Sequence, residues 1–387
     1  MKEVQLKDIC DLDNGFAFKS DDYVDESNTL NCRMSNIRPD GSFDILYSAK
    51  YLPDEFVHKY KDYILRDGDL IIAMTDMAGD PKILGVPTVV NTRGYNLLLN
   101  QRVGKLRLIK NGVNIDYLKL ALQCPNVRHY LKRFAGGGVQ LNVSKKDILN
   151  APVRMRSEDE QKYIAALFMQ VLEVKTRREQ ELQLLDKLIQ ARFIEMFDEK
   201  YPEDTLLNLC NIIDYRGKTP EKVECGLPFI TAKNVKMHYM TLEPQEYISK
   251  ETYDKVMVRG FPKEGDVLFT TEAPLGNVCR IPHFDTEFYI GQRIVTMQTD
   301  ELNTIYLEYA LSDDEFVRKY IGKSSGSTVT GIRVKLLEQL SIPVAPRTLQ
   351  DKFAAFVEQV NKLKVEVRKS LDETQMLFDS LMQKYFG

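Results

Sequence analysis

The stretch that decides the fold of this chain is residues 157–197, which read SEDEQKYIAALFMQVLEVKTRREQELQLLDKLIQARFIEMF. It opens with a capping box, in which Ser157 accepts from a free backbone amide and Glu160 reaches back to the start of the helix. Apolar residues then recur in alternating steps of four and three, and no Gly or Pro interrupts them. This spacing predicts one helix of about 40 residues, roughly 60 Å long. A helix longer than a small domain is wide needs a partner for its apolar stripe.

A second stretch, from Thr348 onward, repeats the same heptad pattern and is the expected partner. The positions predicted to face each other are Ile164, Phe168, Val171, Lys175, Arg178, Leu182, Leu185, Ile189, Arg192 and Met196 in the first helix, and Phe353, Val357, Val360, Lys364, Val367, Leu371, Thr374, Phe378 and Leu381 in the second. The polar members of this seam either fix the register of the helices or mark where the helices separate and meet another subunit.

The segments that precede the two helices share short motifs in the same order, at an offset of about 190–200 residues, which indicates a domain duplication and not a solenoid. The matches pair residues 36–37 with 234–235, 67–71 with 264–268, 100–103 with 291–294, and 151–153 with 342–344. We therefore predict α/β (α+β) architecture: two similar mixed domains at 1–156 and 200–346, a spacer helix at 157–199 and a second at 347–387, with the helices forming an antiparallel coiled coil. Such a chain can be pseudo-twofold, which suits duplex DNA or two identical protein subunits.

Composition sets the class of protein. The 387 residues are 43% hydrophobic and 28% charged, with a formal net charge of −3. No apolar run is long enough for a membrane span, and the first residues lack the apolar core of a signal peptide, so we expect a cytoplasmic protein. The six cysteines and four histidines do not cluster, which argues against a metal site. DNA binding would have to use local basic patches.

Local patterns predict mixed secondary structure in the first domain. Short apolar runs at 69–73, 86–90 and 103–108 are typical of strands, because Gly and Asn bound them. Residues 115–134 are amphipathic and predict a helix that breaks or kinks at Pro125.

At these motifs the chain resembles the specificity (S) subunits of type I restriction-modification enzymes. The motifs are GFAFKS at 15–20, DGDLI at 67–71, NQRV at 100–103, RGKTP at 216–220, GLPFI at 226–230, EGDVL at 264–268, APLG at 273–276, GQR at 291–293 and GST at 326–328. Where family members often carry a Gly-rich turn, this chain has MAGDP at 77–81, so the shape of that loop stays open.

The resemblance implies a function and partners. Two target-recognition domains would each read one half of a bipartite, asymmetric sequence in double-stranded DNA. The helices would act as a ruler and as the dock for two methyltransferase subunits, and motor-nuclease (restriction) subunits can join that core. The chain itself would be a non-catalytic subunit of a DNA methyltransferase and endonuclease complex.

Candidate DNA contacts follow from residue chemistry. Arg contacts phosphate or guanine, Gln and Asn pair with adenine, and glycine backbone approaches phosphates closely. Each feature also has a structural reading: a shared Gln-Arg pair can brace a loop, a shared Asn can cap a turn, and small residues can end a helix. The candidates are Lys19, Arg33, Asn36, Arg38, Gln101, Arg102, Gly137, Gly138, Gln140, Asn142, Arg216, Lys218, Lys233, Asn234, Lys236, Gln292, Arg293, Lys323, Ser324, Ser327, Thr328 and Arg333.

Motifs of catalysis are not found in this sequence. FAGGG at 134–138 matches a methyl-donor pattern, but a helix precedes it where a strand is required. The chain has neither an N-P-P-[YF] or D-P-P-Y catalytic motif nor a phosphate-binding G-x-x-x-x-G-K loop. We therefore expect no cofactor and no catalytic residues. The alternative function is a duplicated protein-binding scaffold that does not contact DNA.

Overall fold

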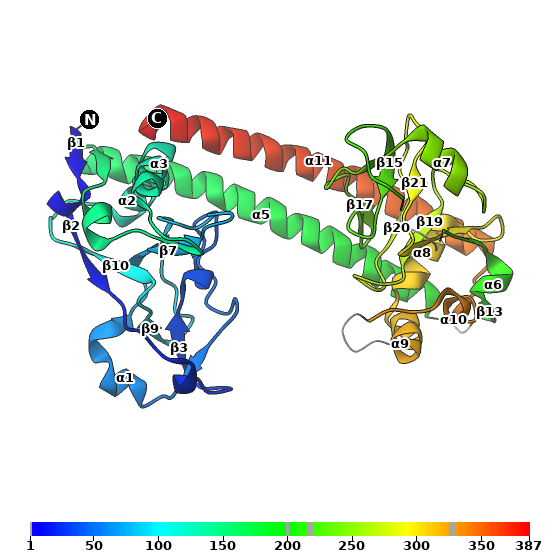
Figure 1. The fold of residues 1–387 in the computed structure, drawn as a ribbon, viewed down its shortest axis with the longest axis horizontal. Helices are drawn as coiled ribbons and strands as arrows, with labels where there is room; N and C mark the ends of the chain where they lie inside the picture. Colours follow the sequence, from blue (N-terminus) through cyan, green and yellow to red (C-terminus); the bar gives the residue numbers. More distant parts are fainter. Residues whose placement is uncertain (1, 199–200, 216–219, 325–329) are drawn as a thin grey trace. The chain divides into compact units, whose positions relative to one another are not determined.

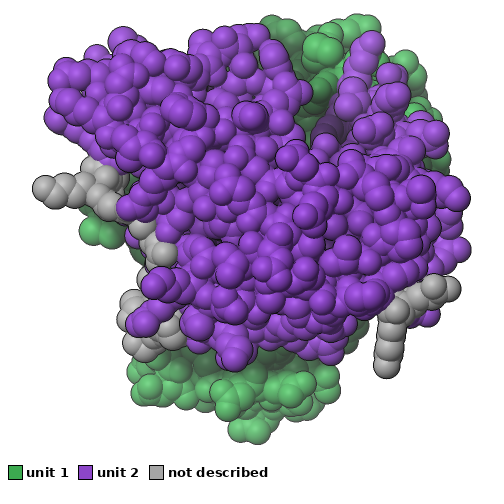
Figure 2. Space-filling view, turned by 90° about the vertical axis from the view of Figure 1, so that its right-hand side faces the viewer, with its two compact units in different colours: residues 1–178, 370–387 green, residues 179–369 purple. Residues whose placement is uncertain are grey.

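The computed structural model describes residues 2–198, 201–215, 220–324 and 330–387. It divides into two compact units, residues 1–178 with 370–387 and residues 179–369 (Figure 2). We call them unit 1 and unit 2. Each unit contains one mixed domain and part of each long helix.

Both predicted long helices are confirmed. They are α5 (Glu158–Phe197) and α11 (Arg347–Phe386), each of 40 residues (Figure 1). The predicted capping box starts α5: the Ser157 backbone amide donates to Glu160 Oε2 at 3.1 Å, and the Glu160 amide donates to Ser157 Oγ at 3.4 Å. These two bonds satisfy amides that have no partner within the helix.

The strands of unit 1 form two four-stranded sheets and two short ribbons. The first sheet has the order β2 (Cys10–Asn14), β10 (Val103–Leu108), β6 (Leu70–Ala73), β8 (Pro87–Val89), and the second β4 (Tyr51–Leu52), β3 (Thr29–Cys32), β9 (Asn96–Leu99), β5 (Ile64–Leu65). The ribbons pair β1 (Lys2–Gln5) with β12 (Pro152–Met155) and β7 (Thr75–Met77) with β11 (Gln140–Asn142). The three predicted strands correspond to β6, β8 and β10.

The helices of unit 1 include the predicted helical segment, which is divided at Pro125. They are η1 (Leu6–Asp8), η2 (Ser20–Asp22), η3 (Met34–Asn36), α1 (Phe56–Lys59), η4 (Lys61–Tyr63), α2 (Ile115–Gln123), α3 (Pro125–Phe134) and α4 (Lys145–Leu149). Pro125 is the first residue of α3, where its missing amide costs nothing. The core joins α2 to the long helices, because the Tyr117 and Phe168 rings lie 5.2 Å and 6.0 Å from that of Phe386.

Unit 2 repeats the order of the first sheet, three strands of the second sheet and one of the two ribbons, which confirms the duplication. Its first sheet has the order β14 (Asn211–Asp214), β22 (Ile294–Gln298), β19 (Val267–Thr270), β20 (Val278–Arg280), and its second β18 (Tyr247–Ile248), β15 (Leu227–Ile230), β21 (Tyr289–Ile290). The ribbons pair β13 (Glu203–Thr205) with β23 (Ser341–Pro343) and β16 (Val235–Lys236) with β17 (Tyr239–Met240). The helices are α6 (Leu206–Leu209), α7 (Lys250–Val256), α8 (Thr304–Ser312), α9 (Asp314–Lys323) and α10 (Val334–Leu337).

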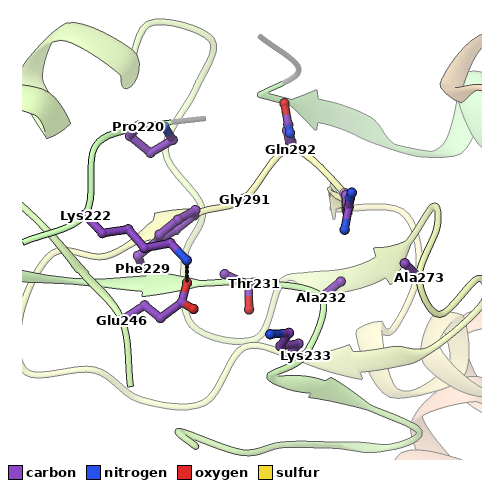
Figure 3. Close-up of a pocket in the computed structure, with 11 residues that line it drawn as sticks. Pro220, Lys222, Phe229, Thr231, Ala232, Lys233, Glu246, Ala273, Gly291 and Gln292 are labelled. Atoms are coloured by element: carbon purple, nitrogen blue, oxygen red, sulfur yellow. Dashed lines mark ion pairs between the residues drawn. The ribbon is translucent and has the colours of Figure 1, made fainter. Parts of the chain in front are cut away.

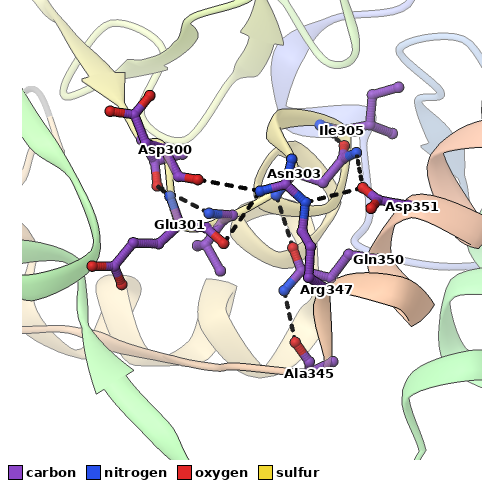
Figure 4. Close-up of polar contacts among 10 residues, drawn as sticks. Asp300, Glu301, Asn303, Ile305, Ala345, Arg347, Gln350 and Asp351 are labelled. Carbon is purple, nitrogen blue, oxygen red and sulfur yellow. Dashed lines mark hydrogen bonds and ion pairs between the residues drawn. The ribbon is translucent and has the colours of Figure 1, made fainter.

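A buried glutamine fixes each domain to its long helix by the same contacts. In unit 1, Gln161 is 3% exposed, and its Oε1 accepts from the Asn114 amide at 2.9 Å. In unit 2, Gln350 is 1% exposed, and its Oε1 accepts from the Asn303 amide at 2.8 Å (Figure 4). Both Nε2 atoms donate to the carbonyl five residues earlier. The duplication therefore extends to individual hydrogen bonds.

The seam between the long helices is apolar at its ends and polar towards its centre. Ile164, Phe168, Val171, Ile189, Phe353, Val357, Val360 and Val367 are buried, as predicted. Lys175 Nζ donates to Gln375 Oε1 at 2.9 Å in unit 1, and Lys364 Nζ donates to Asp186 Oδ1 at 2.5 Å in unit 2. These bonds cross from one long helix to the other, which favours the role in register. The fold class is confirmed, and the pseudo-twofold arrangement stays a prediction.

Three other expectations concern chemistry and membranes. Among the described residues, no helix combines the length and the apolar character needed to cross a bilayer. No group of His, Cys, Asp or Glu side chains in these ranges could hold a metal ion. Burial raises the pKa of Cys10, Cys210 and Cys279 to about 12, so these thiols stay protonated.

Candidate nucleic-acid interface

The two Gln-Arg pairs lie in equivalent turns. Gln101 and Arg102 connect β9 to β10, and Gln292 and Arg293 connect β21 to β22. Gln101 and Arg293 are exposed, whereas Arg102 and Gln292 are half-buried. In unit 1, Asn100 shapes the turn, because its Oδ1 accepts from the Arg102 amide at 3.1 Å. Each Gln-Arg pair therefore follows a strand after one intervening residue.

The first motif of the sequence packs on the turn of unit 1. The Phe16 amide donates to the Leu99 carbonyl at 2.9 Å, and the Gln101 amide donates to the Phe16 carbonyl at 3.0 Å. A Cβ on Gly15 would lie 2.2 Å from the Asn100 carbonyl oxygen, so this close approach requires glycine. Lys19, in the same motif, is exposed. Folding thus brings together motifs that lie far apart in the sequence.

A glycine loop is attached to the turn of unit 1 through its backbone. The Met74 amide donates to the Arg102 carbonyl at 3.0 Å, and the Val143 amide donates to the Met74 carbonyl at 2.9 Å. Val143 follows β11, and the loop that precedes β11 contains the exposed Gly137 and Gly138. At Gly137, φ is +136°, and a Cβ would lie 1.9 Å from the Gln140 carbonyl oxygen.

Unit 2 has the same backbone ladder. The Thr271 amide donates to the Arg293 carbonyl at 2.9 Å, and the Ile332 amide donates to the Thr271 carbonyl at 3.0 Å. The segment before Ile332 is the small-residue loop, of which Ser327 and Thr328 lie outside the described residues. The structure therefore places a Gln-Arg turn beside the base of a loop of small residues in each unit.

The loop flanks show which candidates already have structural partners. Ser324 ends α9, and both its amide and its hydroxyl donate to the Ile321 carbonyl, as expected for a helix cap. Lys323 and Arg333 are exposed on either side of the loop. In unit 1, Asn142 Oδ1 accepts from Thr75 Oγ1 at 2.7 Å, and Gln140 is half-buried.

The two shared asparagines require a correction. Asn36 and Asn234 are 2% and 1% exposed. Their Oδ1 atoms accept from the Arg33 and Thr231 amides at 2.8 Å and 2.9 Å, and their Nδ2 atoms donate to carbonyls of the following loop. Because both ends of each amide are used inside the protein, these side chains brace a loop and do not reach a base edge in this conformation.

The remaining cations are dispersed. Arg38 stacks its guanidinium 3.7 Å from the centre of the Tyr47 ring, and Arg33 is half-buried. Lys233 is exposed, whereas Lys236 is half-buried in β16. Arg216 and Lys218 lie outside the described residues.

A cavity of about 290 Å³ in unit 2 brings three candidates together: Lys233, Gln292 and Arg293 (Figure 3). Its wall also contains Lys222, Phe229 and Glu246, which were not among the predicted contacts. Phe229 does lie within the GLPFI motif, and Lys222 follows RGKTP, so the motifs point to this region. Only the fold shows that Lys222 and Phe229 line the same cavity as the Gln-Arg turn.

Two ion pairs set the charge in this cavity and at its edge. Lys222 Nζ lies 2.8 Å from Glu246 Oε2, and Arg293 Nε lies 2.8 Å from Glu272 Oε1. The Arg293 and Glu272 side chains are 53% and 42% exposed, so water screens their attraction and another anion can replace the carboxylate. Burial raises the pKa of Tyr289, whose ring lies 5.3 Å from that of Phe229 and stays neutral.

Comparison with known proteins shows what this chain is similar to. Residues 1–185 match the model of the type I restriction modification DNA specificity domain. The specificity subunit of the type I restriction enzyme MjaVIII from Methanocaldococcus jannaschii is 22% identical over 192 residues, which are 48% of this chain and 43% of that protein. The match therefore spans less than half the length of this curated relative.

Solved structures share the fold over the whole chain. The S subunit of a type I restriction-modification system from M. genitalium superposes with a TM-score of 0.53 at 13% identity, covering 100% of this chain and 96% of that one. A chain from a structure of type I R-M complex assembly and conformational transition gives a TM-score of 0.55 at 20% identity, covering 100% and 97%.

In fold and in sequence, the chain is similar to specificity subunits of type I restriction-modification systems. Residues 1–185 match the type I restriction modification DNA specificity domain, and the resemblance stated from the motifs is confirmed.

Proposed function

We propose that this chain is the DNA specificity subunit of a type I restriction-modification complex. It binds a bipartite site in double-stranded DNA, one half with each unit, and recruits two methyltransferase subunits. Restriction subunits join the same complex. The chain carries no catalytic step and supplies recognition and spacing.

The observation that carries this proposal is the duplicated backbone ladder. In each unit, a Gln-Arg turn lies beside the base of a loop of small residues, and the same hydrogen bonds connect them. An arginine that lies close in the fold to a glycine loop, as in unit 1, suits the phosphates of DNA. Because the features shared by both units cannot distinguish two different half-sites, we assign Arg102 and Arg293 to the phosphates.

Exposed apolar side chains on the long helices support the recruitment of protein partners. In unit 1, Tyr163 and Met169 on α5 are 64% and 57% exposed. In unit 2, Leu184 and Ile194 on the same helix are 63% and 60% exposed. Contact with a partner subunit would remove these exposed apolar side chains from water, which is favourable.

Sequencing of methylated sites tests the proposal. Cells with the chain and its methyltransferase partner are expected to show a bipartite methylation motif that disappears when the chain is deleted. The purified chain alone is expected to show neither methyl transfer nor DNA cleavage. An unchanged methylome would favour the protein-binding scaffold, and turnover by the isolated chain would refute the non-catalytic role.

Replacing Arg102 with Ala is expected to weaken DNA binding by the assembled complex about tenfold. The loss should be similar for specific and nonspecific DNA, and the slope of log K against log salt should fall by about one, because one phosphate contact is lost. The matched control is Arg107→Ala on β10, where Asp11 and Asp13 already pair with the guanidinium at 3.1 Å and 3.3 Å. Equal effects of both variants on the salt slope would contradict the assignment.

Replacing Glu272 with Gln is expected to strengthen binding about two- to fivefold at low salt. The exposed carboxylate competes with DNA phosphate for Arg293, and an exposed ion pair is worth about 1 kcal/mol or less. Glu264→Gln is the control, because Glu264 lies in the same unit and pairs with His283 at 2.8 Å. Titration of labelled duplex at several salt concentrations measures the difference, and unchanged or weaker binding by the Glu272 variant would count against this role.

A further inference from the structure

We propose that one pair of equivalent positions, Lys50 in unit 1 and Glu246 in unit 2, determines which base each half-site prefers. Glu246 would accept a hydrogen bond from an exocyclic amino group, as presented by cytosine or adenine. Lys50 would donate to the acceptor edge of guanine. This inference rests on the proposed function and assigns base reading to residues outside the shared Gln-Arg turns.

Backbone hydrogen bonds establish that the two positions are equivalent. The Asn31 amide on β3 donates to the Lys50 carbonyl at 2.9 Å, and the Phe229 amide on β15 donates to the Glu246 carbonyl at 2.8 Å. The next residues, at the starts of β4 and β18, accept from Val24 and Val223 at 3.1 Å and 3.0 Å. Tyr23 and Lys222, which precede these valines, are therefore also equivalent.

Through their carbonyls, both positions are bonded to the strand that runs beside the one leading into a Gln-Arg turn. In unit 1, β3 runs parallel to β9, and the Asn100 amide donates to the Cys32 carbonyl at 3.1 Å. In unit 2, β15 runs parallel to β21, and the Gly291 amide donates to the Ile230 carbonyl at 2.8 Å. If the Gln-Arg turn contacts phosphate, Lys50 in unit 1 and Glu246 in unit 2 therefore face the DNA from the same place in the fold.

The side chains at these positions differ in charge and size, although the backbone is the same. In unit 2, the Lys222 ammonium pairs with Glu246 and lies 6.0 Å from the centre of the Phe229 ring, at the wall of the cavity (Figure 3). In unit 1, Lys50 is exposed, with its ammonium 5.9 Å from the centre of the Tyr23 ring. Asn31 supports that ring, because its Nδ2 donates to Tyr23 Oη at 2.8 Å.

The ion pair of unit 2 can open when DNA arrives. The Lys222 side chain is 51% exposed and the Glu246 side chain is 16% exposed, so a phosphate can take over the lysine while the carboxylate stays in the cavity. A carboxylate offers acceptors only, which match the amino group of cytosine or adenine and are repelled by guanine O6 and N7. The ammonium of Lys50 offers donors only, and it matches guanine. The two units would therefore prefer different bases at the equivalent point.

The test exchanges the charges in the full chain assembled with its methyltransferase partner. Glu246→Lys and Lys50→Glu are compared with wild type on a library of randomised half-sites, and methylated products are sequenced. Each variant is expected to lose about 10- to 100-fold of its activity on the original motif, with the change confined to one base position in one half-site. Glu246→Gln, which keeps one acceptor oxygen and adds a donor, is expected to relax that position without inverting it.

Matched controls separate base reading from a general charge effect. Glu287→Lys in unit 2 changes an exposed carboxylate that pairs with Lys250, and Lys61→Glu changes an exposed lysine in unit 1. Both controls are expected to keep the wild-type motif. Circular dichroism and co-purification with the partner check folding, and if Glu246→Lys fails to assemble, Glu246→Gln decides the result.

The outcomes distinguish the two proposals. A wild-type complex without a bipartite motif would overturn the proposed function and this inference with it. A wild-type motif that the Glu246 and Lys50 variants leave unchanged, or change equally in both halves, would overturn this inference alone.

Discussion

A single heptad inserted into α5 after Arg178, with α11 left unchanged, is expected to reduce modification of the native target by at least about 100-fold. The insertion adds about 10 Å to one helix only. The contacts between α5 and α11 in both units can then persist only if one of the helices is distorted, because α5 is now longer than α11 between them. Lys175 and Gln375 lie on one side of the insertion, and Asp186 and Lys364 lie on the other. Both bonds cannot persist with two straight helices of unequal length.

Matched insertions provide the control and the sharper result. Three heptads placed both after Arg178 and after Lys369 fall between the two compact units, so every contact within each unit is kept. The helices lengthen by about 32 Å, which is close to one turn of duplex DNA. The expected motif has the same two half-sites with a spacer longer by about nine base pairs. Sequencing of methylated DNA measures both the loss of modification in the single-insertion variant and the spacer length in the matched variant. An unaltered spacer in the matched variant would refute the proposal that the helices set the spacer length.

Replacing Phe353 with Ala is expected to destabilise unit 2 by about 3–5 kcal/mol. Phe353 is 0% exposed, and its ring lies 5.3 Å from the rings of both Phe193 and Tyr309. It therefore joins α11 to α5 and α8 inside one aromatic cluster. Removing the ring leaves a cavity that rigid helices cannot close, and the lost contacts add to the lost burial.

Thermal and denaturant unfolding of the full chain measure this effect. Leu363→Ala is the matched control, because Leu363 lies on the same helix and is 55% exposed, and its truncation should cost about 0.5 kcal/mol or less. A loss below about 1 kcal/mol for Phe353→Ala would contradict the role of this cluster.

The long helices were predictable because their pattern is local. A capping box and an uninterrupted heptad repeat need no knowledge of distant residues, and α5 and α11 begin within two residues of the positions predicted from Ser157 and Thr348. The duplication was also readable, since repeated motifs report a repeated fold. Local pattern could not show that buried Gln161 and Gln350 brace the domains, because their partners lie 47 residues away in the sequence.

The interface was less predictable from sequence. Asn36 and Asn234 look like base-reading amides, yet loop carbonyls and amides use all of their polar atoms. Conversely, Glu246 carries the wrong charge for a phosphate contact, so its residue type does not mark it as a candidate. Searching a sequence for cations and amides finds groups that can bind the DNA backbone. Such a search cannot show which of these groups become buried when the chain folds. It also cannot show which acidic side chains lie beside them.

The sequence by itself determined the two long helices, the duplication and the resemblance to specificity subunits, because periodicity and motif order are properties of the chain. Only the tertiary structure decided which residues share a surface. Parallel pairing of β3 with β9 and of β15 with β21 brings strands more than 55 residues apart beside the Gln-Arg turns. That pairing depends on how the sheets pack, and it places Lys50 and Glu246 at equivalent points of the two units.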